Sequence, residues 1–470
     1  MTFELRRFRV WGFEVRGEAV SRGLRRRRGL SQFRILTSSG LQALALAALM
    51  VVLAVPAAAL AQMTGVTRTK LPNGLTVLVR ENPEAPVVAY SVMVRMGTRT
   101  ETPENAGISN LLQQMLVRGT EKLNGEEIAE AADRMGGGID AYGDADYSEI
   151  TATALSRNWQ EMLDLIGDCV LRPTLPDGTV QAVRNFLVRQ IRNRGDKPFD
   201  VASDRMRAAL FGMNPYAWDP LGRRESVEKL DRDKLIVYYR RFYVPGQMVI
   251  AVSGDVNTAE VVAQVQKIFG SMAPGKVEMP PVPAPPPMAA TRETVVVPGA
   301  QAQIFMGALA PAFTDADHPP LKVLTSLLGG GMASRFFSEL RDQQALAYTT
   351  LAVYPSRVDQ SAFVAILGTA PENVPKAEPA LTQQLERARN QLASDDEVSV
   401  ARAYVVGSQA MDRRTNARQA WYLAFYEVAG VGYEFLDRYV AAVKNVTPAD
   451  VQRVARKYLS VVRTVVVQPN

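Results

Sequence analysis

The sequence contains a single histidine and a single cysteine among its 470 residues. His318 stands in a polar, proline-containing stretch that is typical of a loop, and Cys169 lies among apolar residues at helical spacing. One cysteine excludes an internal disulfide framework. Because no histidine is near it in sequence to activate it, Cys169 is interpreted as a buried structural thiol and not as a nucleophile. One histidine cannot by itself assemble a three-ligand zinc site.

Positive charge is concentrated at the start of the chain. The segment 1–40 is rich in arginine and poor in acids, whereas basic and acidic side chains almost balance in the remainder. No nucleic-acid-binding surface is therefore inferred. An apolar run over 41–61 ends in small residues at Ala59 and Ala61, as a signal-peptidase site does. We expect 1–61 to be a basic leader and signal peptide that exports the chain to the periplasm. The alternative is an inner-membrane anchor formed by 41–61, because the run is near the ~20 residues that span a bilayer.

A proline-rich stretch divides the rest of the chain. Residues 280–287 read Pro-Pro-Val-Pro-Ala-Pro-Pro-Pro. Such a run cannot enter a helix or a central strand and indicates a semi-rigid linker. We expect a linker over 276–290 between one domain at 62–275 and a second at 291–470.

Both halves mix strands and helices, which indicates an α+β fold. In the first half the pattern predicts strands at 75–79, 87–96, 147–155 and 248–254, and helices from about 106, over 159–170, and to 194 with Asp177 as N-cap. In the second half it predicts strands at 294–297, 303–309, 349–354 and 362–367, a helix to 328, and long helices after the last strand.

The ends of the two halves resemble each other. Residues 233–243 and 449–459 both have an amphipathic helical pattern, and a strand follows each. Two copies of one α+β unit explain this economically. The alternative is chance similarity between two amphipathic helix–strand pairs.

Two features suggest ligand sites but do not fit them. Asp140, Asp144 and Asp146 lack calcium-loop spacing and are interpreted as solvated turn residues. The glycines at 329–331 lack the Gly-Lys-Ser/Thr ending of a phosphate loop, so we expect no nucleotide there.

Residues 107–120 read Gly-Ile-Ser-Asn-Leu-Leu-Gln-Gln-Met-Leu-Val-Arg-Gly-Thr, and a glycine stop, a strand and two helices follow. This order, and its repetition in the second half, resembles the insulinase (pitrilysin) family of zinc metallopeptidases around its His-x-x-Glu-His helix. The resemblance implies two homologous domains, each a mostly antiparallel sheet packed by helices. It also implies a clamshell-type assembly with a partner chain.

The family's metal site falls on amides in this chain. In active members two histidines at i and i+4 share a helix face and bind one zinc, a glutamate between them is the base, and a distant glutamate is the third ligand. The resemblance places these roles on Asn110, Gln114, Gln113 and Gln190. An amide oxygen is a poor zinc ligand beside imidazole or carboxylate, and glutamine cannot accept a proton near neutral pH. We therefore expect no metal and no cofactor in this chain. The alternative is a polar helix face without functional inheritance.

A second family signature is intact over 327–348. In active members an arginine and a tyrosine seven residues apart in this signature reach the substrate, and they correspond to Arg341 and Tyr348. A permanent cation and a hydroxyl donor suit the binding of a developing oxyanion. The alternatives are a surface salt bridge for Arg341 and a core aromatic for Tyr348.

The family's substrate-binding edge strand matches Gly138, Ile139, Asp140 and Ala141. In the family this strand pairs with extended peptide by strand addition. Asp140 stands where active members usually have asparagine.

These features predict a non-catalytic subunit of a heterodimeric insulinase-family metallopeptidase. It would be inactive alone and would supply Arg341 and Tyr348 in trans. Its partner would carry an intact His-x-x-Glu-His motif and the zinc. The alternative is a structural or peptide-binding scaffold with no role in hydrolysis. The four amides disfavour a third reading, an independently active peptidase.

Overall fold

The computed structural model of the chain describes residues 8–10, 13–15, 65–275 and 277–469. The chain divides into two units, Met1–Thr64 and Gly65–Asn470. In the first unit, β1 (Phe8–Val10) pairs antiparallel with β2 (Phe13–Val15). The rest of the predicted leader and the run 41–61 lie outside the described residues. Within the described ranges, no helix is long and apolar enough to cross a membrane.

The first sheet of the second unit has six strands in the order β3-β4-β8-β5-β7-β6. Neighbouring strands run antiparallel, except that β4 and β8 are parallel. The strands are β3 (Val66–Lys70), β4 (Thr76–Glu81), β5 (Val87–Val94), β6 (Gly138–Gly143), β7 (Ser148–Leu155) and β8 (Met248–Gly254). Almost every residue of β5 and β8 is buried because helices cover both faces of the sheet centre.

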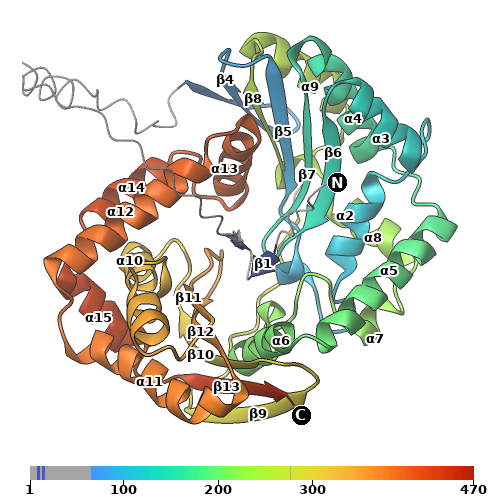
Figure 1. Ribbon diagram of the computed structural model, residues 1–470. Helices are drawn as coiled ribbons and strands as arrows, with labels where there is room; N and C mark the ends of the chain where they lie inside the picture. The colour runs from blue at the N-terminus through green and yellow to red at the C-terminus, as the bar shows by residue number, and fades with distance from the viewer. Residues whose placement is uncertain (1–7, 11–12, 16–64, 276, 470) are drawn as a thin grey trace, which may run out of the picture. The chain divides into compact units, whose positions relative to one another are not determined.

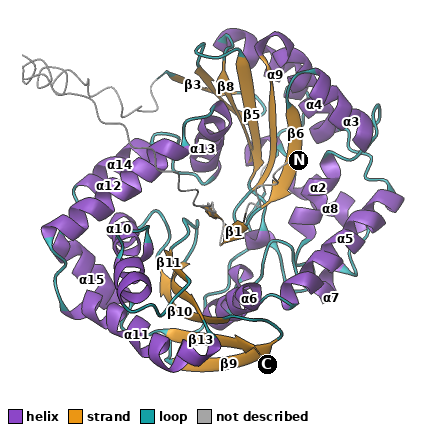
Figure 2. Cartoon of the chain, viewed as in Figure 1, coloured by secondary structure: helices purple, strands orange, loops and turns teal. Residues whose placement is uncertain are grey.

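The helices of this half are α2 (Ile108–Leu116), α3 (Gly125–Arg134), α4 (Trp159–Leu171), α5 (Asp177–Gly195), α6 (Pro198–Phe211), α7 (Arg224–Val227), α8 (Arg232–Phe242) and α9 (Thr258–Phe269). Figure 2 shows α4 and α9 on one side of the first sheet and α13 on the other. The core of this half includes Cys169, which is fully buried, as expected from its spacing. Burial raises the pKa of the Cys169 thiol to about 12, so the thiol stays protonated and unreactive at neutral pH.

The second sheet has five strands in the order β11-β12-β10-β13-β9. These are β9 (Thr291–Val297), β10 (Ala302–Ala310), β11 (Thr349–Val353), β12 (Ser361–Thr369) and β13 (Arg463–Pro469). The helices are α10 (His318–Gly329), the π-helical η6 (Phe336–Gln343), α11 (Val374–Asn390), α12 (Asp395–Asp412), α13 (Asn416–Val428), α14 (Phe435–Lys444) and α15 (Pro448–Tyr458).

The two sheets repeat one topology. The order β4-β8-β5-β7-β6 matches β9-β13-β10-β12-β11, and in each sheet only the first of these pairings is parallel. The sequence repeat corresponds to α8 followed by β8 and α15 followed by β13, which occupy equivalent places. The predicted α+β fold of two similar halves is confirmed.

One helix from each half packs against the sheet of the other half (Figure 1). α13 packs on β5 and β8, and α6 packs on β10 and β13. Gly307 of β10 permits the close approach of α6, because an added Cβ would lie 2.5 Å from the sulfur of Met206. Sequence periodicity predicts an apolar helix face but not which sheet it covers.

Two local expectations were wrong. Asp177 is the first residue of α5 and not its cap, because Pro176 is the N-cap residue. His318 is the first residue of α10 and is only 2% exposed, whereas a loop was expected. Prolines are tolerated in a helical first turn, where their missing N–H groups would have no partner, so Pro319 and Pro320 start this helix rather than prevent it.

Candidate functional site

Helix α2 carries three of the four predicted amide positions and is held at its start by a buried carboxylate. Glu101 accepts hydrogen bonds from the backbone N–H groups of Gly107 at 2.9 Å and Ser109 at 3.0 Å. The indole N–H of Trp218 donates to it at 3.0 Å. Burial raises the pKa of Glu101, and these three donors oppose that rise. Glu101 therefore fixes the orientation of α2, a role that no sequence pattern indicated.

Asn110 and Gln114 share one face of α2, as their i, i+4 spacing predicts. The Gln114 side-chain amide donates to the Asn110 side-chain oxygen at 3.3 Å. The backbone N–H of Gly143, at the end of β6, donates to the same oxygen at 3.4 Å. The Asn110 oxygen is thus already engaged between α2 and β6.

Gln113 is fully buried. Its side-chain oxygen accepts a hydrogen bond from the Tyr243 hydroxyl at 2.5 Å, and its amide nitrogen has no partner among the described residues. Burial raises the pKa of Tyr243 well above its usual value, which keeps this hydroxyl a donor. Gln113 is therefore part of the core.

Gln190 lies half-buried on α5, which packs against α2.

The side chains of Asn110, Gln113, Gln114 and Gln190 do not fit a zinc ion. Two of their oxygens are committed to other donors, and none of the side chains is an imidazole or a carboxylate. Across the described ranges, no three His, Cys, Asp or Glu side chains come together as a possible metal site.

Arg341 and Tyr348 lie in the other half, around η6 and the start of β11. Both are exposed, Tyr348 to 60%, and the Arg341 guanidinium lies 4.7 Å from the centre of the Phe337 ring. Tyr348 is therefore not a core aromatic, which was the alternative considered for it. Between Arg341 and Tyr348, Ala345 adopts a left-handed backbone with φ of 52°.

Strand β6, which includes Gly138, Ile139, Asp140 and Ala141, is the outermost strand of its sheet and pairs with β7 alone in the strand order. Such an edge suits strand addition by an extended peptide. Asp140 is exposed, and its carboxylate accepts a hydrogen bond from the Ala141 backbone N–H at 2.7 Å.

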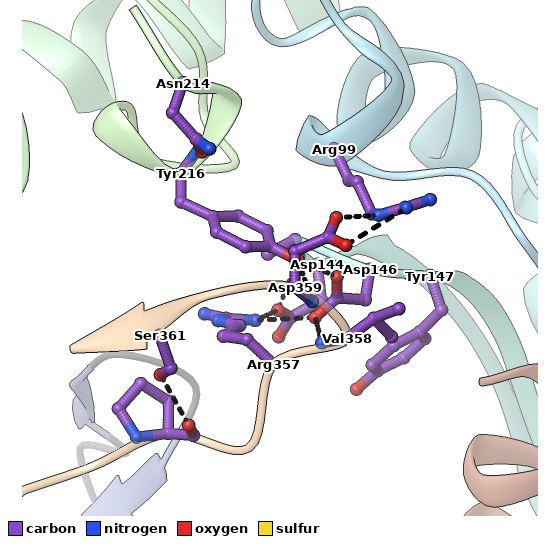
Figure 3. A network of polar contacts seen from close by, with 12 residues as sticks. Arg99, Asp144, Asp146, Tyr147, Asn214, Tyr216, Arg357, Val358, Asp359 and Ser361 are labelled. Carbon is purple, nitrogen blue, oxygen red and sulfur yellow. Dashed lines mark hydrogen bonds and ion pairs between the residues drawn. The ribbon is translucent and has the colours of Figure 1, made fainter. Parts of the chain in front are cut away.

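The interpretation of three solvated turn acids was correct for Asp140 only in its exposure, because Asp140 lies in β6 and not in a turn, and it was wrong about the solvation of Asp144 and Asp146. The side chains of Asp144 and Asp146 are only 13% and 3% exposed, and both face Arg357. Their partner, Arg357, belongs to the other half of the chain, so the local spacing of the acids could not predict it. Figure 3 shows the network that these residues form with Tyr216, Arg99 and Asp359.

Comparisons with known proteins agree with this architecture. A family model described as Insulinase (Peptidase family M16) matches residues 76–221, and one described as Peptidase M16 inactive domain matches 229–405. An uncharacterized zinc protease of Streptomyces coelicolor is 28% identical over 405 residues, which are 84% of this chain and 87% of the relative. One of Mycobacterium leprae is 31% identical over 309 residues, 64% of this chain and 68% of the relative.

Two crystal structures have the same fold. A protease from Helicobacter pylori has a TM-score of 0.81 and 22% identity, covering 86% of this chain and 99% of that chain. A peptidase M16 inactive domain from Pseudomonas fluorescens has a TM-score of 0.80 and 19% identity, covering 86% and 98%. At these identities the likeness shows the fold alone.

Proposed function

Because the chain belongs to the insulinase family of peptidases (peptidase family M16), we propose that it is the zinc-less subunit of a two-chain member of that family. In this proposal it pairs with a family member that carries an intact His-x-x-Glu-His helix and holds the zinc. This chain supplies Arg341 and Tyr348 in trans for peptide hydrolysis. The leader over 1–61 leads us to propose the periplasm, or its membrane face, as the place of action.

One contrast between the two halves supports this proposal. In the first half, the position of the family's base is Gln113, which is fully buried and bonded to Tyr243. In the second half, Arg341 and Tyr348 are exposed and stand free of the core. Exposure leaves both side chains accessible to a substrate or to a partner chain, as a role in trans requires.

The chemistry proposed for the pair is binding and not proton abstraction. The Tyr348 hydroxyl can donate a hydrogen bond to an oxygen on which negative charge develops. Arg341 is a permanent cation with a forked set of donors and can hold a substrate carbonyl or carboxylate in place. Its packing on Phe337 limits the directions that the guanidinium can take.

The exposed edge of β6 favours a second candidate function, peptide binding without hydrolysis. An extended segment could add to β6 through main-chain hydrogen bonds alone. This candidate needs neither Arg341 nor Tyr348, and the same experiment separates the two.

The test is hydrolysis of a quenched fluorescent peptide library by this chain, by a zinc-helix relative from the same genome, and by their mixture. We expect only the mixture to cut efficiently. Arg341→Ala and Tyr348→Phe should each lower kcat/KM of the mixture by about 100-fold, as removal of one oxyanion donor does elsewhere.

Matched controls come from the same half. Arg292→Ala removes an exposed arginine that pairs with Glu378, and Tyr404→Phe removes the hydroxyl of a tyrosine that is 50% exposed. Neither should change kcat/KM. If the relative is fully active alone and none of the four variants alters the mixture, the scaffold function replaces the proposed one.

A further inference from the structure

A polar network joins the two halves of the second unit (Figure 3). The first half contributes Asp144 and Asp146, from the turn between β6 and β7, together with Arg99 and Tyr216. The second half contributes the loop 354–360 between β11 and β12, with Arg357 and Asp359. We call these six residues the inter-half network.

Arg357 is its centre. One guanidinium nitrogen lies 2.7 Å from a carboxylate oxygen of Asp144 and 3.8 Å from one of Asp146. The guanidinium carbon lies 5.7 Å from the centre of the Tyr216 ring. The side chains of Arg357 and Asp144 are 15% and 13% exposed, so both charges are largely withdrawn from water.

The two residues after Arg357 also hold this loop against the first half. The backbone N–H of Val358 donates to Asp146 at 3.3 Å, and that of Asp359 donates to the Tyr216 hydroxyl at 3.3 Å. The Tyr216 hydroxyl in turn donates to Asp146, and Arg99 pairs with the Asp359 carboxylate. The loop is therefore fixed by its backbone as well as by its charges.

The network lies at the ends of two strands that matter for the proposed function. Asp144 directly follows Gly143, the last residue of the edge strand β6. Arg357 comes shortly after Val353, the last residue of β11, and β11 begins directly after Tyr348. The backbone of the Asp144 turn is itself fixed, since Thr98 N–H donates to the Asp144 carbonyl oxygen at 3.2 Å.

Buried ion pairs contribute little net stability, because desolvation offsets most of the attraction between the charges, but removal of one partner is costly. We propose that the Asp144–Arg357 pair is a positioning pair that sets the placement of β6 relative to β11. It thereby holds the Arg341–Tyr348 segment where a partner chain can use it. The geometric part stands without the proposed function, and the kinetic part rests on it.

The geometric part is tested with the chain alone. Spin labels are attached at Val237→Cys on α8 and Val400→Cys on α12, which are 69% and 51% exposed at the native residues, in a Cys169→Ala background. We expect Arg357→Gln and Asp144→Asn each to shift or broaden the distance distribution between the labels. Arg357→Lys, which keeps the charge, should largely restore it.

The control variant is Arg224→Gln, which breaks an exposed ion pair with Glu228 on the first half alone and should leave the distribution unchanged. Far-UV circular dichroism confirms that each variant is folded. If Arg357→Gln does not fold, Asp144→Asn and the more exposed Asp359→Asn carry the test. Unchanged distances in these variants overturn the proposal.

The kinetic part is tested in the mixture with the zinc-helix relative. Arg357→Gln should lower kcat by about tenfold with little change in KM, because a displaced segment loses orientation more than affinity. A changed distance with an unchanged kcat in an active mixture overturns the kinetic part. Changed distances with no activity in the unmodified mixture leave the positioning pair intact and count against the proposed function instead.

Discussion

The Tyr243 hydroxyl donates a hydrogen bond to the side-chain oxygen of Gln113 at 2.5 Å, inside the core of the first half. Gln113 is the residue to which the sequence resemblance assigns the position of the family's catalytic base, and Tyr243 is the C-cap residue of α8. The glutamine is therefore integrated into the packing of two helices. The Gln113 amide nitrogen remains unpaired among the described residues, which makes this a costly polar group to bury.

This pair gives a prediction about stability. Tyr243→Phe should lower the free energy of unfolding by about 1–3 kcal/mol, because it leaves the Gln113 oxygen buried without a donor. The double variant Gln113→Met with Tyr243→Phe should cost less than Tyr243→Phe alone, because it also removes the unpaired nitrogen. Urea unfolding followed by circular dichroism measures both. A double variant that is less stable than Tyr243→Phe would contradict this account, and Tyr404→Phe is the exposed control.

The four amides at the family's zinc-site positions do not fit zinc, and this gives a second prediction. The native chain, dialysed against zinc and desalted, should retain far less than one zinc per chain by atomic emission. A variant with Asn110→His, Gln113→Glu, Gln114→His and Gln190→Glu should retain about one, because α2 and α5 already pack together. Retention of one zinc by the native chain, lost on Asn110→Ala, would show that the amides do bind metal.

The local frame of this fold could be predicted from the sequence. Alternation and turn residues indicated most of the strands within a few residues but not β3, and β6 was expected only from the family resemblance. The order of elements indicated two similar halves. The i, i+4 spacing of Asn110 and Gln114 correctly predicted a shared helix face, since that spacing depends only on helical geometry.

Long-range partners could not be predicted. Asp146 and Arg357 belong to different halves of the sequence, and their contact depends on how the two halves pack. The sequence does not indicate that α6 packs on the second sheet and α13 on the first, because an apolar helix face fits either sheet. The burial of His318 depends on its packing against Tyr354 and Tyr439, which are also distant in sequence.

Strain between Arg341 and Tyr348 gives a third prediction. Ala345 has a φ of 52°, and a left-handed backbone costs a non-glycine residue about 1–2 kcal/mol. Ala345→Gly should therefore leave the free energy of unfolding unchanged or raise it by up to about 1 kcal/mol. Ala345→Gly should also lower kcat of the mixture with the zinc-helix relative if the strained backbone fixes the positions of the Arg341 and Tyr348 side chains.

The matched control is Ala403→Gly on α12, an exposed alanine inside a helix. There the substitution should lower stability by about 1 kcal/mol. Thermal unfolding of the two variants side by side measures the difference. Equal destabilisation by both would show that Ala345 carries no backbone strain.

The buried carboxyl of Asp146 gives the last prediction, on pH. Burial raises its pKa from 3.8 to about 6, although Arg357 and Tyr216 oppose the rise. Since the folded pKa lies above the unfolded one, the folded state binds the proton more tightly. The contribution of this group to stability is therefore fully present below about pH 4 and is lost as the pH rises through 6.

Comparison of the native chain with Asp146→Asn isolates this effect, because asparagine does not titrate. The free energy of unfolding of the native chain minus that of the variant should fall by up to about 3 kcal/mol between pH 4 and pH 7. Urea unfolding at half-unit steps of pH measures the difference, and other titrating groups cancel in the subtraction. A difference that stays flat, or that rises with pH, would mean that Asp146 is held as a carboxylate by Arg357 strongly enough to overcome its burial.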